Sequence, residues 1–233
     1  MNRRIRINPT FIRISPFILF MGFVALEECL RAINQSGFIN LEPSTFFWLY
    51  PPKAGLVCLM IVVFWRHYNE ITFTDLLTYR NSIISIISGI IVFLLWIKMD
   101  WSLEIQSPVE GFNPNLFNNE LTKWLMIFVR LSGAVIVVPI MEELFWRSFL
   151  LRYLINQDFI NVNIGQFNIL SFSVVTVLFA LEHHYIFAGV MAGVIFNIVY
   201  YVTKSISHCI LSHATANFCL GLFVLITGEW RFW

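Results

Sequence analysis

Residues 123–147 read "KWLMIFVRLSGAVIVVPIMEELFWR", an apolar run that ends in two adjacent carboxylates, Glu142 and Glu143. A membrane-spanning helix needs about 20 predominantly apolar residues, so 123–141 predicts one span. The helical pattern continues to about residue 155, which predicts an unusually long helix, and Pro139 is placed to kink it one turn before the glutamates. This stretch therefore predicts a membrane protein that holds acids within a span.

The composition supports the same class. Hydrophobic residues make up 58% of the 233 and charged residues only 12%, against about 25% charged in soluble domains. The mean hydropathy is +0.74. The net charge is +1, with no basic stripe beyond the N-terminus, which argues against a nucleic-acid partner. The four cysteines stand singly in apolar runs and predict no disulfide framework.

Apolar windows predict about seven spans across the chain. They are 16–33, 46–65, 81–98, 123–141, 169–186, 187–203 and 205–227. No linker, repeat or low-complexity tract divides them. We therefore expect an all-α, polytopic membrane helix bundle of about seven (six to eight) transmembrane helices in a single integral-membrane domain, 1–233.

Charge places the loops relative to the membrane. The N-terminus carries Arg3, Arg4, Arg6 and Arg13, and no small-residue cleavage site follows the first apolar run. We expect an uncleaved first span in the cytoplasmic (inner) membrane with its N-terminus in the cytoplasm. The segment 34–45 has no Lys or Arg and 99–122 is acidic, so both are expected outside, and 66–80 is expected inside. Aromatics near span ends, Tyr50 and Trp96 among them, are expected at the interfaces.

Polar residues within spans gather in the second half of the chain. An ionised side chain at the bilayer centre costs about 2.5–3.5 kcal/mol, so these residues are expected to face a protected interior. Glu143 and Arg147 are four residues apart, as are His213 and Asn217, and each pair shares a helix face. If Arg147 neutralises Glu143, Glu142 remains as the free carboxylate.

This set of side chains suits hydrolysis of an amide bond. A carboxylate and one histidine can take a proton from water, while the other histidine and an asparagine can donate hydrogen bonds to an oxyanion. The same nitrogens and oxygens also suit a divalent metal such as zinc. The H-E-x-x-H pattern of soluble zinc proteases is absent, and no Ser–His or Cys–His nucleophile stands out.

Other polar residues have plainer interpretations. The earlier acidic pair, Glu27 and Glu28, precedes Arg31 and is expected to cap a helix end or to pair locally. Arg130 is expected to form an ion pair with an acid of the outer loop or with a buried glutamate. Asn197 is expected to form a hydrogen bond between helices.

Three segments resemble the motifs of the CPBP intramembrane proteases, which include the CAAX prenyl proteases and bacteriocin-processing enzymes. The family motifs run E-E-x-x-x-R, F-x-x-x-H and H-x-x-x-N/D. Here they stand as "EELFWR", "FALEH" and "HATAN", which supply Glu142, Glu143, Arg147, Phe179, His183, His213 and Asn217 in the family's order. The whole chain also looks like a CAAX-protease-related branch associated with exosortase sorting systems.

The resemblance implies a role for each motif residue. Glu142 would be the general base on water, assisted by His183, while His213 and Asn217 would stabilise the oxyanion. Glu143, Arg147 and Phe179 would support them. A metal-dependent variant of the mechanism would use Glu142, His183 and His213 as ligands. The catalytic core would span about 123–227.

The expected partners are membrane lipid and a membrane-anchored protein or peptide substrate, cut near its C-terminus. The substrate would belong to an exosortase-linked sorting system if the finer resemblance holds. Glu182 and His184 flank His183, which leaves open whether either joins the site. Two alternatives stay open: a proton- or ion-coupled transporter, since relays use buried Glu and His, and a non-catalytic peptide-binding or immunity protein of the membrane.

Overall fold

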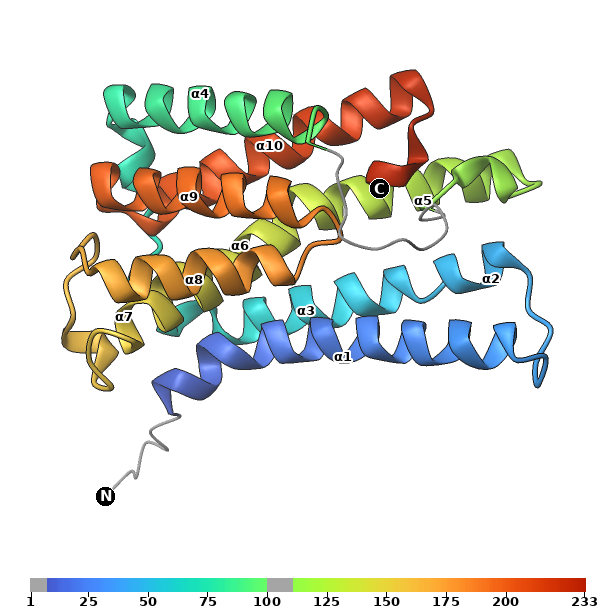
Figure 1. Ribbon diagram of the computed structural model, residues 1–233, viewed down its shortest axis with the longest axis horizontal. Coiled ribbons are helices and arrows are strands. Elements are labelled where there is room, and N and C mark those ends of the chain that lie inside the picture. Colours follow the sequence, from blue (N-terminus) through green and yellow to red (C-terminus); the bar gives the residue numbers. More distant parts are fainter. Residues whose placement is uncertain (1–7, 100–110) are drawn as a thin grey trace.

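The computed structural model describes residues 8–99 and 111–233, and every regular element in these ranges is a helix. The helices are α1 (Pro9–Gln35), α2 (Pro43–Phe47), α3 (Tyr50–Phe64), α4 (Tyr79–Trp96), α5 (Glu120–Ser132), α6 (Val138–Glu143), α7 (Leu151–Tyr153), α8 (Ile169–Leu181), α9 (Ile186–Thr203) and α10 (Ile206–Thr227). Figure 1 shows the long helices aligned along one axis, as in an all-α membrane bundle.

Six helical segments of the described chain are long and apolar enough to cross a membrane. They are Pro9–Gln35, Pro43–His67, Tyr79–Trp96, Glu120–Tyr153, Ile186–Thr203 and Ile206–Thr227. The protein is therefore an integral, multi-pass membrane protein, as expected. Side-chain caps fix several helix starts: Asn119 accepts from Thr122 N, and Asn168 accepts from Ser171 N, which satisfies amide groups that have no partner within the helix.

The predicted span 169–186 is wrong in its second half. Helix α8 ends at Leu181, and a turn of four residues leads directly into α9 at Ile186. Thirteen residues rise about 20 Å, which is too short for a hydrocarbon core of about 30 Å. Helices α8 and α9 pack along each other as a hairpin whose turn lies partway along the bundle, not at its end (Figure 1).

The fourth span is one continuous helical run of 34 residues, Glu120–Tyr153, as its pattern predicts. Two π-helical segments interrupt it, η4 (Gly133–Val137) and η5 (Leu144–Leu150). Pro139 follows the first of these. A proline inside a helix has no N–H to donate and clashes with the carbonyl one turn earlier, and widening the preceding turn relieves both problems. The second segment follows the paired glutamates directly and carries Arg147.

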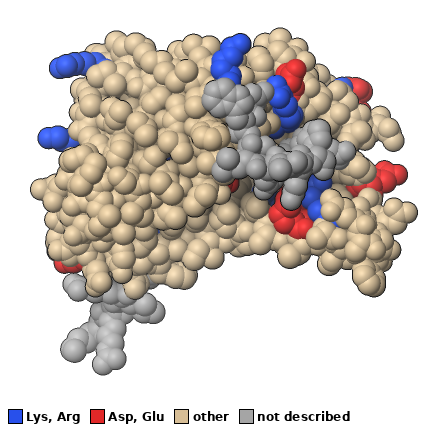
Figure 2. Space-filling view, viewed as in Figure 1, with Lys and Arg blue, Asp and Glu red and all other residues tan. Residues whose placement is uncertain are grey.

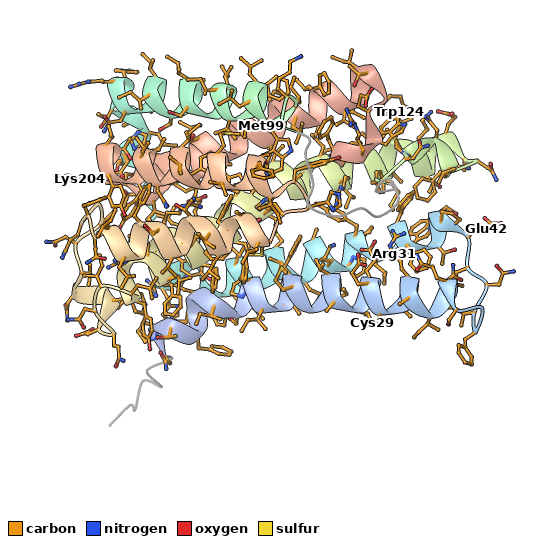
Figure 3. The ribbon with its side chains drawn as sticks, viewed as in Figure 1. Cys29, Arg31, Glu42, Met99, Trp124 and Lys204 are labelled. Atoms are coloured by element: carbon orange, nitrogen blue, oxygen red, sulfur yellow. The ribbon has the colours of Figure 1, made fainter. Side chains whose placement is uncertain are left out.

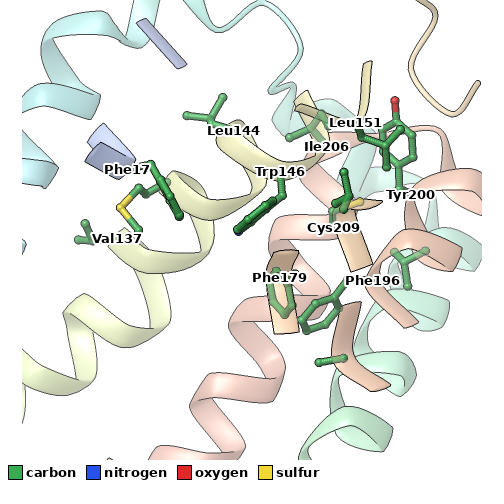
Figure 4. Close-up of a cluster of buried hydrophobic side chains, with 14 of the residues drawn as sticks. Phe17, Val137, Leu144, Trp146, Leu151, Phe179, Phe196, Tyr200, Ile206 and Cys209 are labelled. Carbon is green, nitrogen blue, oxygen red and sulfur yellow. The ribbon is translucent and has the colours of Figure 1, made fainter. Parts of the chain in front are cut away.

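Small residues bring α4 and α10 into close contact. A Cβ on Gly89 would lie 2.3 Å from Ser212 O and 2.7 Å from Thr215 Cβ, so only glycine fits this approach. The small residues around His213 thus do what such residues do between membrane helices. Beneath the surface, the largest apolar cluster joins α1, the long fourth helix, α8, α9 and α10 through side chains such as Phe17, Trp146 and Phe196 (Figure 4).

The two ends of the bundle carry different segments. Lys204 lies at the end where α1 begins, while Arg31, Glu42 and Trp124 lie toward the other end (Figure 3). The connections 65–79, 153–169 and 203–206 share the first end, and 35–43 and 111–120 share the second (Figure 1). Most of the visible face is free of charged side chains, several of which gather toward the second end (Figure 2). The residues Asp100, Glu104 and Glu110 of the predicted outer loop lie outside the described residues.

Candidate active site

The two adjacent glutamates have different surroundings, although both are buried on α6. The Glu143 side chain is fully buried and its Oε1 accepts a hydrogen bond from the Arg147 guanidinium at 3.0 Å. This is the (i, i+4) ion pair that the spacing predicts. The Glu142 side chain points elsewhere: it lines a cavity, and its Oε2 has no hydrogen-bond partner among the described residues. Glu142 is thus the carboxylate left free by the pairing of its neighbour.

Arg147 links three helices. Besides Glu143, it donates from Nε to Asn197 Oδ1 on α9 at 3.2 Å, and Asn197 donates in turn to Thr176 Oγ1 on α8 at 3.1 Å. The guanidinium also lies 4.8 Å from the centroid of the Phe179 ring. Asn197 therefore forms the bond between helices that was expected of it. The network fixes the helix that carries Glu142 against α8 and α9.

His213 on α10 is oriented by Glu143. Its Nδ1 lies 3.0 Å from Glu143 Oε1, and because a carboxylate only accepts, Nδ1 carries the hydrogen of this bond. The Phe196 ring stacks on the imidazole, with centroids 4.8 Å apart. The other nitrogen, Nε2, lies 4.0 Å from Glu142 Oε2. That separation is too long for a direct hydrogen bond and suits two groups that share one water molecule.

His183 follows the last turn of α8, on the turn that leads to α9. Its Nδ1 lies 2.7 Å from the Phe179 carbonyl oxygen, so Nδ1–H is the donor and Nε2 is left for the cavity. The edge of Trp96 contacts the ring, with centroids 5.3 Å apart. Phe179, the aromatic of the second motif, thus supports His183 through its backbone and packs beside it, with ring centroids 4.7 Å apart.

Asn217 lies one turn beyond His213 on α10. Its side-chain amide donates to the carbonyl oxygen of Ala134, in the π-helical segment η4, at 2.8 Å. An amide nitrogen has two hydrogens, so one remains for another acceptor. The widened turn at η4 therefore does more than accommodate Pro139, because it supplies the carbonyl that orients Asn217.

One cavity of about 310 Å³ gathers the free ends of these side chains. Glu142, His183, His213 and Asn217 all line it, although they come from three separate segments of the chain. Its volume is at the lower end of the range for ligand sites, about 300–1,000 Å³, and most of its wall is apolar. Of the side chains beside His183, Glu182 lines the cavity and accepts from Trp146 Nε1 at 3.2 Å, whereas His184 is exposed.

Three lining residues were not predicted as part of a site. Tyr50 and Trp96 were expected at membrane interfaces, yet both line the cavity, and Tyr50 is buried. Arg130 also lines it. Among the described residues no carboxylate pairs with Arg130, and most acids of the outer loop lie outside those residues, so its expected ion pair stays a prediction. The earlier acidic pair behaves as expected, since Glu27 accepts from Arg31 at 2.8 Å.

A metal site would need several donors in one place. Across residues 8–99 and 111–233, no three His, Cys, Asp or Glu side chains form a group that could hold a metal ion. The described donors therefore do not assemble the set of Glu142, His183 and His213 that a metal-dependent variant would use. Metal dependence stays a prediction that a chelator tests.

Comparison with known proteins points to one family. Residues 121–219 match the family model described as Type II CAAX prenyl endopeptidase Rce1-like. The match contains all seven motif residues. No curated protein and no solved structure matched the chain in the same comparisons.

Proposed function

Residues 121–219 belong to the Rce1-like family of type II CAAX prenyl endopeptidases, and from this premise we propose that Glu142-activated water cleaves a peptide bond near the C-terminus of a membrane-anchored substrate. The family makes the chain a CAAX-type protease embedded in the membrane. The single observation that carries the proposed mechanism is the 4.0 Å separation between Glu142 Oε2 and His213 Nε2 inside a cavity.

The proposed attack uses a water molecule between these two atoms. Glu142 accepts one hydrogen of the water and His213 Nε2 accepts the other, which leaves an oxygen lone pair directed into the cavity. Because Glu143 holds His213 through Nδ1, the imidazole keeps this orientation. Glu142 removes the proton as the water attacks the carbonyl carbon and delivers it to the leaving amine, as a general base and acid does.

Negative charge then develops on the carbonyl oxygen. Asn217 donates its remaining amide hydrogen to this oxygen, since its other hydrogen is held by Ala134 O. His183 lines the same cavity with Nε2 free of a hydrogen, since Nδ1–H donates to the Phe179 carbonyl oxygen, so Asn217 is the donor to the oxyanion in this proposal. Relative to the roles implied by the resemblance, this proposal gives the water-orienting role to His213, because His213 Nε2 lies 4.0 Å from Glu142 Oε2.

The substrate is proposed to enter from the lipid as an anchored peptide. Most of the cavity wall is apolar, which suits a tail rich in apolar side chains. The same proposal includes a substrate from an exosortase-linked sorting system. It also places the protein in the inner membrane with its N-terminus in the cytoplasm.

The test uses protein in lipid nanodiscs and a library of lipid-anchored peptides with a fluorophore and a quencher on either side of each C-terminal region. We expect cleavage by the wild type and a loss of kcat/KM of about 10²–10⁴-fold in Glu142→Gln. Asn217→Ala should lose about 10²–10³-fold. Glu28→Gln removes the same charge outside the cavity and should cleave like the wild type.

Two outcomes would overturn the proposal. Equal cleavage by the wild type and Glu142→Gln would remove Glu142 as the base. A wild type that binds the peptides and cleaves none would favour the non-catalytic alternative. A chelator added to the same assay tests metal dependence, since loss of activity that zinc restores would call for a metal-based mechanism.

A further inference from the structure

The cavity carries a cation that none of the steps above uses. Arg130 lines the cavity on α5, and its buried Nε has no hydrogen-bond partner. Its guanidinium lies 4.3 Å from the centroid of the Tyr50 ring, whose hydroxyl donates to the Arg130 carbonyl oxygen at 3.2 Å. By contrast, Arg13, Arg31 and Arg147 each form a salt bridge with a glutamate. Within residues 8–99 and 111–233, Arg130 is thus held in place without an anion.

A second cation lies close to the first. The Lys53 side chain is buried, and its ammonium lies 4.8 Å from the Phe20 ring and 5.4 Å from the Tyr50 ring, both of which line the cavity. Its nearest carboxylate, Glu27 at 3.8 Å, is already paired with Arg31. Among the described residues, Arg31 and Lys53 therefore share one carboxylate, and no carboxylate is paired with Arg130.

An excess of positive charge in a poorly hydrated wall is unfavourable by itself, and it becomes favourable when an anion arrives. The guanidinium fork matches a carboxylate in two parallel hydrogen bonds, which a single ammonium cannot do. The cavity wall therefore has the chemistry of a receptor for a carboxylate at the Arg130 position.

The distance from Arg130 to the proposed water sets the length of the peptide segment that can bind between them. Arg130, Ala134, Val138 and Glu142 recur every four residues along one helical run and all line the cavity. The twelve positions from Arg130 to Glu142 rise about 18 Å, which corresponds to about five residues of extended peptide. Ala134 and Val138, the side chains between, are small and apolar, so they leave room for such a segment.

We propose that Arg130, assisted by Lys53, binds the free C-terminal carboxylate of the substrate and so selects the bond about four to six residues from its end. This inference rests on the proposed function for its cleavage site, but the carboxylate subsite can be tested without cleavage. Arg130 acts on substrate affinity and position and takes no part in the proton transfers.

The binding test uses the Glu142→Gln protein in phosphatidylcholine nanodiscs and a fluorescent, lipid-anchored apolar peptide. The peptide is made with a free C-terminal carboxylate and with a C-terminal amide, and fluorescence anisotropy gives the Kd of each. We expect the amide to bind about tenfold or more weakly, as expected for losing a charge-assisted hydrogen bond. Adding Arg130→Gln should abolish the difference between the two peptides.

Two further variants serve as controls for the binding test. Lys53→Gln should reduce the difference in Kd and keeps the test decisive if Arg130→Gln does not fold. Lys123→Gln removes a cation from the same helix, α5, outside the cavity, and should leave the difference unchanged. In active enzyme, mass spectrometry should find a released peptide of about four to six residues.

Equal Kd values for acid and amide would overturn the subsite, whether or not the wild type cleaves. Absence of cleavage with a retained preference for the acid would instead overturn the proposed function and leave the subsite standing. If nanodiscs of phosphatidylglycerol abolish the preference, and Arg130→Gln loses co-purified anionic lipid, the cation binds a lipid headgroup and the inference is wrong.

Discussion

At the scale of single residues, hydrogen-bond and ion-pair partners distinguish Glu142 from Glu143, although both are buried. Both are glutamates in one apolar stretch, yet Glu143 holds a salt bridge with Arg147 and a hydrogen bond with His213, while Glu142 Oε2 faces His213 across 4.0 Å. Pairing keeps the Glu143 charge in a buried place, and the lack of it keeps Glu142 available. The adjacent acids therefore serve one site in two different ways.

The Arg147–Glu143 pair gives the first prediction. Arg147→Met leaves a buried carboxylate without its cation, and breaking a buried pair in this way destabilises by about 3–5 kcal/mol. We expect a clearly lower midpoint of thermal unfolding in detergent, followed by tryptophan fluorescence. Arg80→Met is the matched control, since Arg80 is exposed and its loss should change stability by less than about 0.5 kcal/mol. An unchanged midpoint for Arg147→Met would contradict the prediction.

At the scale of elements, α4 and α10 make a close contact at Gly89, beside the turn of α10 that carries His213. Gly89→Ala places a methyl group 2.3 Å from the Ser212 carbonyl, so the helices must separate, which we expect to destabilise by about 1–3 kcal/mol. Chemical unfolding in detergent measures the effect. The same substitution at Gly55, where no atom lies within 4 Å of the added carbon, should be neutral or slightly stabilising. Similar losses of unfolding free energy for Gly89→Ala and Gly55→Ala would show that the contact between α4 and α10 does not contribute to stability.

Glu70 joins elements at the end where α1 begins. It lies between two spans and accepts from Arg13 Nε at 2.7 Å, from Arg13 Nη2 at 2.8 Å and from the Ser148 hydroxyl. Burial alone would raise the pKa of Glu70, but the hydrogen bonds and charge of Arg13 and the hydrogen bond from Ser148 lower it below the ordinary 4.5. The carboxylate thus connects α1 to the long fourth helix.

Because the folded pKa of Glu70 is depressed, its stabilisation is fully present above pH 4.5 and is lost as the pH falls through the folded pKa. We expect Glu70→Gln to be less stable than the wild type at pH 7, with a gap in unfolding free energy that narrows below pH 4.5. Unfolding in detergent between pH 3 and pH 7 measures this gap. The control is Asp158→Asn, at an exposed acid, whose difference in unfolding free energy from the wild type should not narrow at low pH. A gap for Glu70→Gln that does not change with pH would contradict the lowered pKa of Glu70.

The elements also show what the sequence was able to predict. Hydropathy predicted the all-α membrane class, and four-residue spacing predicted the Glu143–Arg147 pair, because both depend on local periodicity. The end of α8 at Leu181 was not predicted, because Glu182 and His183 follow an apolar helix without a proline or glycine that would mark its end. The positions of Tyr50 and Trp96 in the cavity wall were not predicted either. In the sequence, an aromatic residue near the end of a span has the same pattern whether it faces lipid headgroups or a cavity.

At the scale of the whole molecule, the cavity lies nearer one end of the bundle. Its wall includes Tyr50 at the start of α3, Trp96 at the end of α4, Arg130 on α5 and Trp233 at the C-terminus. In Figure 1 the end of α4 and the C-terminus lie partway along the bundle, away from the start of α1 and on the side of the connection 35–43. If the arginine-rich N-terminus lies in the cytoplasm, the cavity faces the outer side of the membrane. The orientation of the chain thus decides from which side a substrate tail arrives.

The last prediction tests that orientation. In a protein whose four cysteines are replaced by alanine, Ser36→Cys places one thiol on the connection after α1, and Gln157→Cys places one on the connection after α7, both at exposed positions. A membrane-impermeant maleimide applied to intact spheroplasts should label the first thiol and leave the second unlabelled until the membrane is opened. The reverse pattern would place the cavity toward the cytoplasm, because the two connections lie at opposite ends of one bundle (Figure 1). The carboxylate subsite at Arg130 would then select cytoplasmic tails, so this single measurement decides which proteins are available as substrates.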